Sequence, residues 1–547
     1  MHVSREFAPA LTTAQPRHIT LLRPSMVQSP HAWIAAFTPP LGLAYLASSL
    51  RAAGHTVEAI DAIAEGLEQY LEEDGYTFQG LSIEETIDRL DPATDLIGVS
   101  CMFTQDWPWL RRVLRAIRQR FPSTTIVIGG EHVTACPEFC LRDCPEIDYC
   151  VLGEGEATLV ELAANVGDRQ GSDHVPGLAM LRDGEFVRSA PRERIREVDK
   201  IPWPAWDLFP VEKYLTSDNG HGVHLGRSMP ILATRGCPYK CTFCSNPVMY
   251  GNLWMPREPA DVLDEIEHYL HTYGAENIDF YDLTMIVRKS WILEFCRLID
   301  ERGLKFTWQL PTGTRSEVVD DEVSAALYRT GCRHIVYAPE SGSAETLRDI
   351  KKQVDLAKVT ASMRMALRNR LAIKCNLIIG FPHETRRQLW QTLRFYWRLA
   401  VLGVDVSAIY LFSPYPGSDL YNELRADGTI GAMDDDYFRS LAAFADAVNA
   451  ASYSKHMSSR ELFWYRTLGM LVFAVLCFGL HPGRLLRLCK NLLWCERHET
   501  LLETRLAAMI KRFRAPKRKL AGVEASGRTP VPAPIAQAAS LGAMTGS

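Results

Sequence analysis

Residues 235–247 read RGCPYKCTFCSNP, and this stretch decides the fold. It places Cys237, Cys241 and Cys244 in C-x-x-x-C-x-x-C spacing on a segment whose glycine and prolines predict a loop. Thiolates are the ligands that iron in iron–sulfur clusters takes from proteins, and a loop of this length can wrap three corners of a cubane. We therefore predict that the three cysteines hold a [4Fe–4S] cluster with one open iron and form the catalytic metal site.

A zinc ion, or three unconnected thiols, is the alternative. Structural zinc takes four ligands, and the nearby sequence offers no obvious fourth, since His221 and His224 lie in a glycine-rich loop upstream. A second cysteine group, Cys136, Cys140 and Cys144, has the spacing of one helix face. Buried thiols that act as small hydrophobic side chains explain this second group better than a second metal site does.

Strand and helix patterns alternate around and after the cysteine loop. Such alternation predicts a parallel sheet with crossover helices, and six repeats outline an incomplete β/α barrel. The reactive groups of these barrels lie on loops after the carboxyl ends of the strands, and the cysteine loop follows the first strand. The expected strands are residues 229–236, 277–282, 306–312, 334–340, 373–380 and 405–412.

Residues 18–165 show the same alternation and predict a separate, doubly wound α/β domain of Rossmann-like type. Sheets of this kind bind ligands beyond the carboxyl ends of their strands, where Asp61, Ser100, Gly129 and Gly130 are expected. The expected strands are residues 19–24, 56–61, 96–101 and 125–130, and the expected helices are residues 41–54 and 108–121.

The rest of the chain differs in composition. A length of 547 residues fits about three units. Proline-rich and Ala/Pro/Gly/Ser-rich stretches oppose regular structure. We expect a disordered N-terminus at 1–17, a linker at 166–225, the barrel at 226–430, a helical extension at 431–520 and a disordered tail at 521–547.

Charge and cysteine content limit the functional classes. The chain has 60 Lys and Arg against 65 Asp and Glu, a net charge of -5, which argues against a nucleic-acid-binding protein. Fourteen cysteines, with no apolar leader in the opening residues, predict a cytoplasmic location.

One apolar segment, residues 462–480, approaches the length of a membrane span, but Arg466 and Thr467 interrupt it. A basic run at 511–519 follows. These two features predict either a charged helix end in solvent or peripheral contact with an anionic membrane through the C-terminal extension.

RGCPYKCTFCSNP resembles the cluster motif of radical S-adenosylmethionine (SAM) enzymes. YAPESGS at 337–343, NLIIGFPHET at 376–385 and FSPYPGSDLY at 412–421 resemble later segments of the same barrel. The resemblance implies that bound SAM is cleaved reductively to a 5′-deoxyadenosyl radical, which abstracts hydrogen from an unactivated carbon. It also implies an external electron donor such as flavodoxin or ferredoxin.

The resemblance assigns cofactor-binding roles within these segments. Glu340 is expected to help hold the ribose or methionyl group of SAM, together with Ser341 and Gly342 of the same motif. Gly380 and Pro382 are expected to let the backbone approach the adenine.

Three further candidate site residues lie at or after the ends of expected strands. Asp279 and Asp282 follow an expected barrel strand, where they either position SAM or substrate or cap the strand. Arg315 is expected either to contact the carboxylate of SAM or to form a surface salt bridge.

Residues 39–62 and 128–162 resemble the cobalamin-binding domain that precedes the barrel in one large radical SAM subclass. The usual D-x-H-x-x-G motif is altered, because Ile63 replaces the histidine between Asp61 and Gly66. The resemblance thus implies cobalamin bound without a protein histidine ligand, its displaced tail lying along Ser100, Gly129 and Gly130. The loop at 101–107 then packs on the corrin or only fills a domain interface; a domain that has lost its ligand is the alternative.

The domain pairing predicts a cobalamin-dependent radical SAM methyltransferase that methylates a carbon of a lipophilic small molecule. An oxidative cyclase or rearrangement enzyme, similar to the anaerobic magnesium-protoporphyrin monomethyl ester cyclase, needs the same cofactors and stays open. A non-catalytic cobalamin or redox sensor is the third reading, and an intact SAM-binding constellation argues against it.

Overall fold

The computed structural model describes residues 15–29, 37–73, 76–217, 220–314, 317–446, 448–494 and 499–514. These residues all belong to one compact unit, residues 1–515, and the following segment lies outside the described residues. The expected disorder at 1–17 and 521–547 concerns residues that are almost entirely outside the description, since only 15–17 are described.

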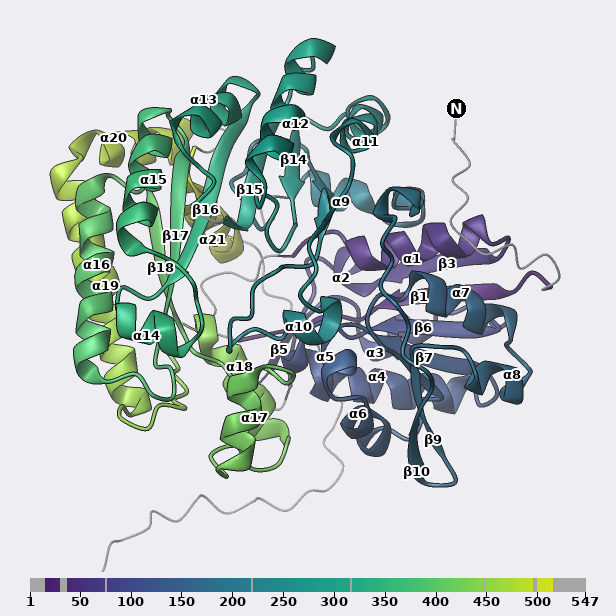
Figure 1. Ribbon diagram of the computed structural model, residues 1–547. Helices are drawn as coiled ribbons and strands as arrows, with labels where there is room; N and C mark the ends of the chain where they lie inside the picture. Colours follow the sequence, from purple (N-terminus) through teal and green to yellow (C-terminus); the bar gives the residue numbers. More distant parts are fainter. Residues whose placement is uncertain are drawn as a thin grey trace, which may run out of the picture. The chain divides into compact units, whose positions relative to one another are not determined.

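The N-terminal half contains a seven-stranded sheet in the order β10-β9-β8-β7-β6-β1-β3 (Figure 1). β3, β1, β6, β7 and β8 run parallel, as expected for a doubly wound domain. Their central residues are buried apolar side chains, since helices cover both faces of the sheet. The strands are β1 His18–Arg23, β3 Thr56–Asp61, β6 Leu96–Ser100, β7 Thr125–Gly129, β8 Tyr149–Val151, β9 Leu178–Arg182 and β10 Glu185–Arg188.

Helices lie between the strands of this half, and the last one follows the final strand. They are α1 Leu41–Ala52, α2 Ala62–Glu65, α3 Ile83–Ile87, α4 Trp107–Arg120, α5 Glu131–Ala135, α6 Pro137–Asp143, α7 Glu156–Ala164, α8 Arg169–Asp173 and α9 Val211–Leu215. A small antiparallel sheet, not expected from the sequence, is formed by β2 Met26–Gln28, β5 Tyr76–Gln79 and β4 Tyr70–Glu73.

The segment expected to be a linker, residues 166–225, begins with structure that belongs to the first sheet. β9 and β10 form an antiparallel hairpin whose two turn residues are Asp183 and Gly184. Both have positive φ, 52° and 82°, which is the conformation that a two-residue hairpin turn requires. The Asp-Gly pair was the sequence signal for this hairpin. Only the later part of the segment connects the two sheets.

The second half contains a six-stranded, fully parallel sheet in the order β11-β14-β15-β16-β17-β18. Each strand coincides with one of the six expected runs, so the partial barrel is confirmed. The strands are β11 Ser228–Ile231, β14 Asn277–Phe280, β15 Thr307–Thr314, β16 Cys332–Glu340, β17 Ala372–Ile379 and β18 Val406–Leu411, and a short pair is formed by β12 Thr234–Arg235 and β13 Met255–Pro256.

Helices follow the barrel strands and continue beyond the last one. The helices within the barrel are α10 Asn246–Tyr250, α11 Pro259–Thr272, α12 Lys289–Arg302, α13 Asp321–Arg329, α14 Ala344–Asp349, α15 Leu356–Arg368 and α16 Arg386–Leu402. The helices after it are α17 Asp419–Ala426, α18 Asp435–Ala442, α19 Ser459–Leu480, α20 Pro482–Trp494 and α21 Leu501–Arg514. The helical C-terminal extension is therefore present in the described part of the chain. Its long helix α19 lies against α16 (Figure 1).

Candidate functional site

The cysteine loop leaves the barrel after β12 and is held by backbone hydrogen bonds. Gly236 has a φ of 82°, and a Cβ there would lie 2.1 Å from the Leu253 carbonyl oxygen, so only glycine fits. The Thr242 N–H donates to the Ile350 carbonyl at 3.0 Å, and the Leu420 N–H donates to the Thr242 carbonyl at 2.9 Å. The loop is therefore fixed between the ends of α14 and α17.

The three cysteines of the loop fit a polynuclear cluster better than a single ion. Cys237, Cys241 and Cys244 are all half-buried. Among the described residues, the two groups whose ligand atoms all lie within 4.8 Å of one another, as around one ion, do not include this triad. Burial raises the pKa of Cys244 to about 12, and a metal ion bound to a thiol lowers its pKa. Spacing and chemistry both suit thiolates at separate corners of an iron–sulfur cluster.

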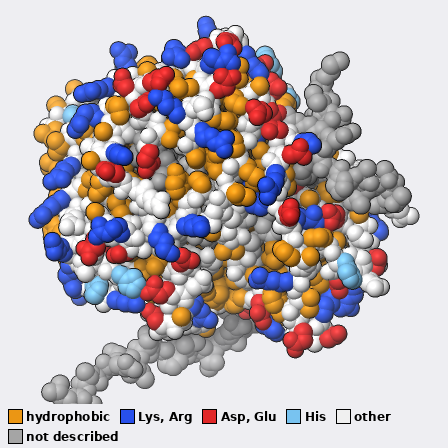
Figure 2. Space-filling model, viewed as in Figure 1, with side chains coloured by type: hydrophobic (Ala, Val, Ile, Leu, Met, Phe, Trp, Pro, Cys, Tyr) orange, Lys and Arg blue, Asp and Glu red, His pale blue; other side chains and the backbone are white. Residues whose placement is uncertain are grey.

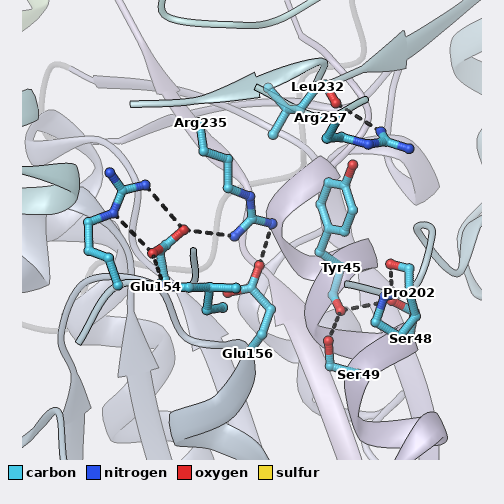
Figure 3. Close-up of polar contacts among 11 residues, drawn as sticks. Tyr45, Ser48, Ser49, Glu154, Glu156, Pro202, Leu232, Arg235 and Arg257 are labelled. Carbon is cyan, nitrogen blue, oxygen red and sulfur yellow. Dashed lines mark hydrogen bonds and ion pairs between the residues drawn. The ribbon is translucent and has the colours of Figure 1, made fainter. Parts of the chain in front are cut away.

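Arg235, directly before this loop, fastens the barrel to the first domain (Figure 3). Its guanidinium lies 3.1 Å from Glu154, just before α7, and 2.5 Å from Glu156, the first residue of α7, and it stacks over the ring of Tyr45 at 5.1 Å. The arginine and both carboxylates are buried. Arg194 shares Glu154 at 3.1 Å. The GEGE sequence at 153–156 thus sets the position of the cysteine loop, a role that the sequence did not reveal.

A second contact joins the two predicted ligand-binding ends. Glu131 follows Gly130 at the carboxyl end of β7, and its carboxylate accepts a hydrogen bond from Ser245, which follows Cys244. Nearby, the Thr134 hydroxyl lies 3.5 Å from the Met249 sulfur. The carboxyl end of the first sheet therefore faces the cysteine loop.

Asp61 has internal partners in the structure. It is fully buried, and its carboxylate accepts hydrogen bonds from the Tyr214 hydroxyl at 2.5 Å and from the Ala64 N–H at 3.2 Å. Arg23 lies 3.8 Å from the same carboxylate. Asp61 thus caps α2 and ties the later linker to the sheet, and its contact with a cofactor stays a prediction.

The position that carries a histidine in the usual cobalamin motif faces the protein interior. Ile63 is buried in a small apolar cluster with Phe37, Ala64 and Tyr214. An isoleucine side chain has no donor atom for cobalt, and the surrounding cluster explains why an apolar residue is stable here.

The remaining predicted residues at this end are small and half-buried. A Cβ at Gly130 would lie 2.4 Å from the Cys101 carbonyl, so this glycine is needed for backbone packing. A Cβ at Gly129 would meet only Val151, at 3.6 Å, which is an ordinary contact. The fold therefore does not require glycine at 129, and the contact of Gly129 with a cofactor stays a prediction. Ser100 is also half-buried at this end.

The loop at 101–107 has one face toward solvent and one toward the core. Met102 and Phe103 are exposed, although both are large and apolar. Trp107 is fully buried, and its indole N–H donates to Asp143 at 2.8 Å. Met102 and Phe103 are thus the residues of this loop that can cover the apolar face of a corrin. Cobalamin fits these residues.

Glu340 lies at the carboxyl end of β16 in an unusual conformation. Its φ is 70°, and its buried carboxylate pairs with Lys352 at 3.0 Å. The Lys352 ammonium also lies 6.0 Å from the ring centroid of Phe243, between two of the cysteines. The structure therefore places Glu340 close to the cysteine loop, and its contact with SAM stays a prediction.

The other motif residues lie near α16 and α19. The Ser341 hydroxyl bonds to that of Thr392 at 2.9 Å, and a Cβ on Gly342 would overlap Phe395. A Cβ on Gly380 would lie 2.7 Å from Leu462. The Pro382 carbonyl accepts from the Lys455 N–H at 2.9 Å. Packing accounts for all four positions, and their contact with SAM stays a prediction.

Two buried aspartates occupy the end of β14. Asp282 accepts hydrogen bonds from the Thr234 hydroxyl at 2.5 Å and the Ala233 N–H at 3.2 Å, which ties it to the strand before the cysteine loop. Asp279 accepts from Gln309 at 2.7 Å. Burial raises the pKa of each carboxyl to about 6. Arg315, the remaining candidate, lies outside the described residues.

The three cysteines of the second group do not come together in the structure, although their spacing places them on one helix face. His132, Cys136 and Cys140 bring their ligand atoms within 4.8 Å of one another, whereas Cys144 contacts Glu146 at 3.3 Å. His132 is buried and its Nδ1 lies 3.1 Å from the Thr104 hydroxyl. The sequence identified the cysteines but not this histidine.

Two family models match the chain, the B12 binding domain over residues 32–163 and the Radical SAM superfamily over residues 231–396. An uncharacterized methyltransferase of Pyrococcus horikoshii is 31% identical over 72% of this chain and 80% of its own length. The chain belongs to the radical SAM enzymes that carry an N-terminal B12-binding domain. The resemblance drawn from the motifs is thus confirmed.

Other relatives of this radical SAM enzyme include methyltransferases and cyclases. The cytidylyl-2-hydroxyethylphosphonate methyltransferase of Streptomyces wedmorensis is 27% identical over 76% of this chain and 83% of its own. The anaerobic magnesium-protoporphyrin IX monomethyl ester cyclase of Cereibacter sphaeroides is 28% identical over 72% of this chain and 61% of its own length.

Solved structures share the fold. TsrM from Kitasatospora setae, a radical SAM methyltransferase solved with cobalamin and a [4Fe-4S] cluster, has a TM-score of 0.57 at 20% identity, covering 76% of this chain and 75% of its own. Apo OxsB, a cobalamin-dependent SAM radical enzyme, has a TM-score of 0.64 at 15% identity. The match covers 91% of this chain and 80% of OxsB.

Proposed function

We propose that this enzyme is a cobalamin-dependent methyltransferase that methylates an unactivated carbon of a lipophilic small molecule. The hydrogen bond between Glu131 and Ser245 carries the proposal, because it joins the ligand-binding end of the first sheet to the cysteine loop. When bound, the cluster supplies the electron for SAM cleavage and cobalamin supplies a carrier for a methyl group. A flavodoxin or ferredoxin is the proposed source of the electron.

The chain's own residues position these groups. Arg235 holds the cysteine loop against the first domain through Glu154 and Glu156. Glu340 and Lys352 form a buried charged pair beside that loop, suited to the polar part of SAM.

Apolar side chains at the strand ends support a lipophilic substrate. Large apolar residues are exposed after β6, after the cysteine loop and after β14, although such residues are usually buried. These residues are Met102, Phe103, Val248, Leu253 and Leu283. Such side chains offer dispersion contacts to an apolar molecule.

The mode of cobalamin binding is part of the proposal. We propose that no protein histidine ligates cobalt, because Ile63 fills the motif position and is buried with Phe37 and Tyr214. Electron paramagnetic resonance of the cob(II)alamin-loaded protein tests this. We expect no nitrogen splitting that responds to uniform 15N labelling of the protein, and splitting that does respond would overturn the point.

Methyl transfer is tested with protein reconstituted anaerobically with iron, sulfide and hydroxocobalamin, and supplied with reduced flavodoxin, methyl-labelled SAM and a bacterial lipid extract. We expect label in the organic-soluble fraction, together with S-adenosylhomocysteine and 5′-deoxyadenosine. Label only in water-soluble products would overturn the lipophilic substrate. The triple Cys→Ala variant at 237, 241 and 244 is the control and should give no 5′-deoxyadenosine.

A cyclase is the second candidate, and the similarity to the magnesium-protoporphyrin cyclases favours it. Product mass separates the two candidates. A gain of one methyl group supports methyl transfer, whereas 5′-deoxyadenosine formed without S-adenosylhomocysteine, with loss of hydrogen or gain of oxygen in the product, supports the cyclase.

A further inference from the structure

Helix α19 is largely apolar but lies mostly outside the core. Among the described residues it is the one helix long and apolar enough to cross a membrane, yet only 28% of its most apolar window is buried. A core helix would be buried on most sides. The buried residues form a single stripe, namely Leu462, Arg466, Gly469, Phe473 and Cys477.

This stripe is attached to the barrel along the whole helix. The Trp397 indole N–H donates to the Gly469 carbonyl at 3.2 Å, and the ring centroids of Tyr396 and Phe473 lie 4.8 Å apart. Just beyond its end, Arg484 donates to the Val404 carbonyl at 3.0 Å. To span a bilayer, α19 would have to break these contacts, so it lies along the barrel surface instead.

The opposite side of α19 presents large apolar side chains to solvent. Trp464, Leu471 and Val475 are 62%, 61% and 65% exposed, and α19 carries no charged residue after Arg466. The neighbouring helix α20 adds Leu486, which is 75% exposed. An exposed apolar surface of this kind marks an interaction site.

Basic helices lie next to the apolar side chains. Helices α15, α16 and α20 contain no Asp or Glu, although the whole chain has a net charge of -5. Figure 2 shows Lys and Arg side chains along the left margin of the molecule, where Figure 1 labels α15, α16, α19 and α20. The exposed basic residues of α15 and α16 include Lys358, Arg364, Arg368, Arg387, Arg394 and Arg398.

A groove of about 460 Å³ opens between α15 and α16 within this surface. Leu356, Phe395 and Leu399 give it an apolar lining, and Arg394 and Arg398 also line it. Neither arginine forms an ion pair or hydrogen bond within the part of the chain that the structure describes. Two unpaired guanidinium groups beside an apolar groove match a phosphate attached to hydrocarbon.

We propose that α15, α16, α19 and α20 form a surface that docks on an anionic phospholipid membrane. Arg394 and Arg398 bind a lipid phosphate at the groove, while Trp464, Leu471 and Val475 enter the boundary between headgroups and acyl chains. This inference stands apart from the proposed methyl transfer. A lipophilic substrate would, however, reach the enzyme from the same membrane.

Flotation of the full-length protein with vesicles tests the proposal. We expect binding to vesicles of phosphatidylcholine and phosphatidylglycerol at 3:1, and weaker binding to phosphatidylcholine alone or at high salt. Each basic residue near an anionic surface contributes about 1 kcal/mol, so the Arg387→Gln/Arg394→Gln/Arg398→Gln variant should lose about a hundredfold in partitioning. Leu471→Glu/Val475→Glu should abolish flotation.

Matched controls lie elsewhere on the surface. Arg120→Gln/Arg188→Gln/Lys305→Gln removes the same charge, and Val187→Glu alters an exposed valine of the first domain; both should float like the wild type. Circular dichroism confirms that each variant is folded. The proposal is overturned if the wild type does not float, or if the α16 and α19 variants float as well as their controls. It is also overturned if Leu471→Glu/Val475→Glu only converts a dimer to a monomer, or if deletion of 516–547 alone removes flotation.

Discussion

The carboxyl ends of the two parallel sheets carry motif residues in contrasting environments. In the first sheet, Asp61 is fully buried and its carboxylate is occupied by Tyr214 and the cap of α2. In the barrel, Cys237, Cys241 and Cys244 are half-buried on a loop whose backbone is fixed from both sides. A motif position serves a ligand when the fold holds its backbone and leaves its side-chain donor accessible.

The same contrast separates structural acids from candidate functional acids. Glu154 and Glu156 are paired with Arg235, and Glu154 is also paired with Arg194, so both carboxylates align the two halves of the enzyme. Glu340 is paired with a single lysine beside the cysteine loop and retains acceptor capacity. Pairing therefore sorts the buried carboxylates into those that hold the fold and those that can hold a cofactor.

The cysteine loop gives the largest expected effect. Cys241→Ala should lower iron content to background and 5′-deoxyadenosine formation by more than about a thousandfold, because the cluster loses one of only three protein ligands. Iron and sulfide analysis with product chromatography measures both. Cys489→Ala, at an exposed cysteine of α20, should retain the cluster. Equal loss of iron in both variants would contradict the assignment of the cluster to the cysteine loop.

Arg235 gives the next effect. Arg235→Gln leaves Glu154 and Glu156 buried with weaker pairing, and removing one partner of a buried pair costs about 3 to 5 kcal/mol. Denaturant unfolding should show this loss. The control, Arg51→Gln, breaks an exposed pair with Asp207 and should cost less than about 1 kcal/mol. Similar losses would mean that the interdomain network has no special role.

A Tyr214 variant tests whether Asp61 only stabilises the fold or also binds cobalamin. Tyr214→Phe removes a buried hydrogen bond to a carboxylate and should cost about 1 to 3 kcal/mol, with hydroxocobalamin affinity unchanged within about threefold. Unfolding curves and absorbance titrations measure the two quantities. Tyr149→Phe, whose hydroxyl bonds to Asp173 at 3.0 Å, is the matched control. Lost cobalamin affinity in Tyr214→Phe with unchanged stability would place Asp61 in the ligand site.

Glu384 gives a smaller, pH-dependent effect. Burial raises its pKa to about 8, and its carboxyl accepts from the Gly380 N–H at 2.6 Å. Because the folded pKa exceeds the unfolded one, stability from this group is complete at acidic pH and is lost as pH rises to about 8. Melting temperatures should therefore favour Glu384→Gln over the wild type increasingly from pH 5 to pH 8. A constant difference would mean that Glu384 is already ionised.

The strands were predictable because the signal for each is local. Period-two and continuous apolar runs identified all six barrel strands and the parallel strands β1, β3, β6 and β7. The position of the cysteine loop after the first barrel strand followed from chain order alone. The hairpin of β9 and β10 was missed, although Asp183-Gly184 marks its turn.

The remaining features depend on contacts between distant residues. The pairs Arg235–Glu154 and Ser245–Glu131 join positions 81 and 114 residues apart, and no periodic pattern encodes them. His132 is an exception, because it stands four residues before Cys136, the same spacing that separates Cys136 from Cys140, so a local pattern did mark it. The basic face of α15 and α16 likewise becomes a surface only when the barrel folds.

The central claim is that the carboxyl end of the first sheet faces the cysteine loop, so that both cofactors act at one site. Electron paramagnetic resonance of the reduced cluster, recorded with and without cob(II)alamin, tests it most directly. We predict that cob(II)alamin broadens the cluster signal and speeds its relaxation through magnetic coupling, and that Glu131→Ala weakens the effect. A cluster signal that is identical with and without bound cob(II)alamin would contradict the account.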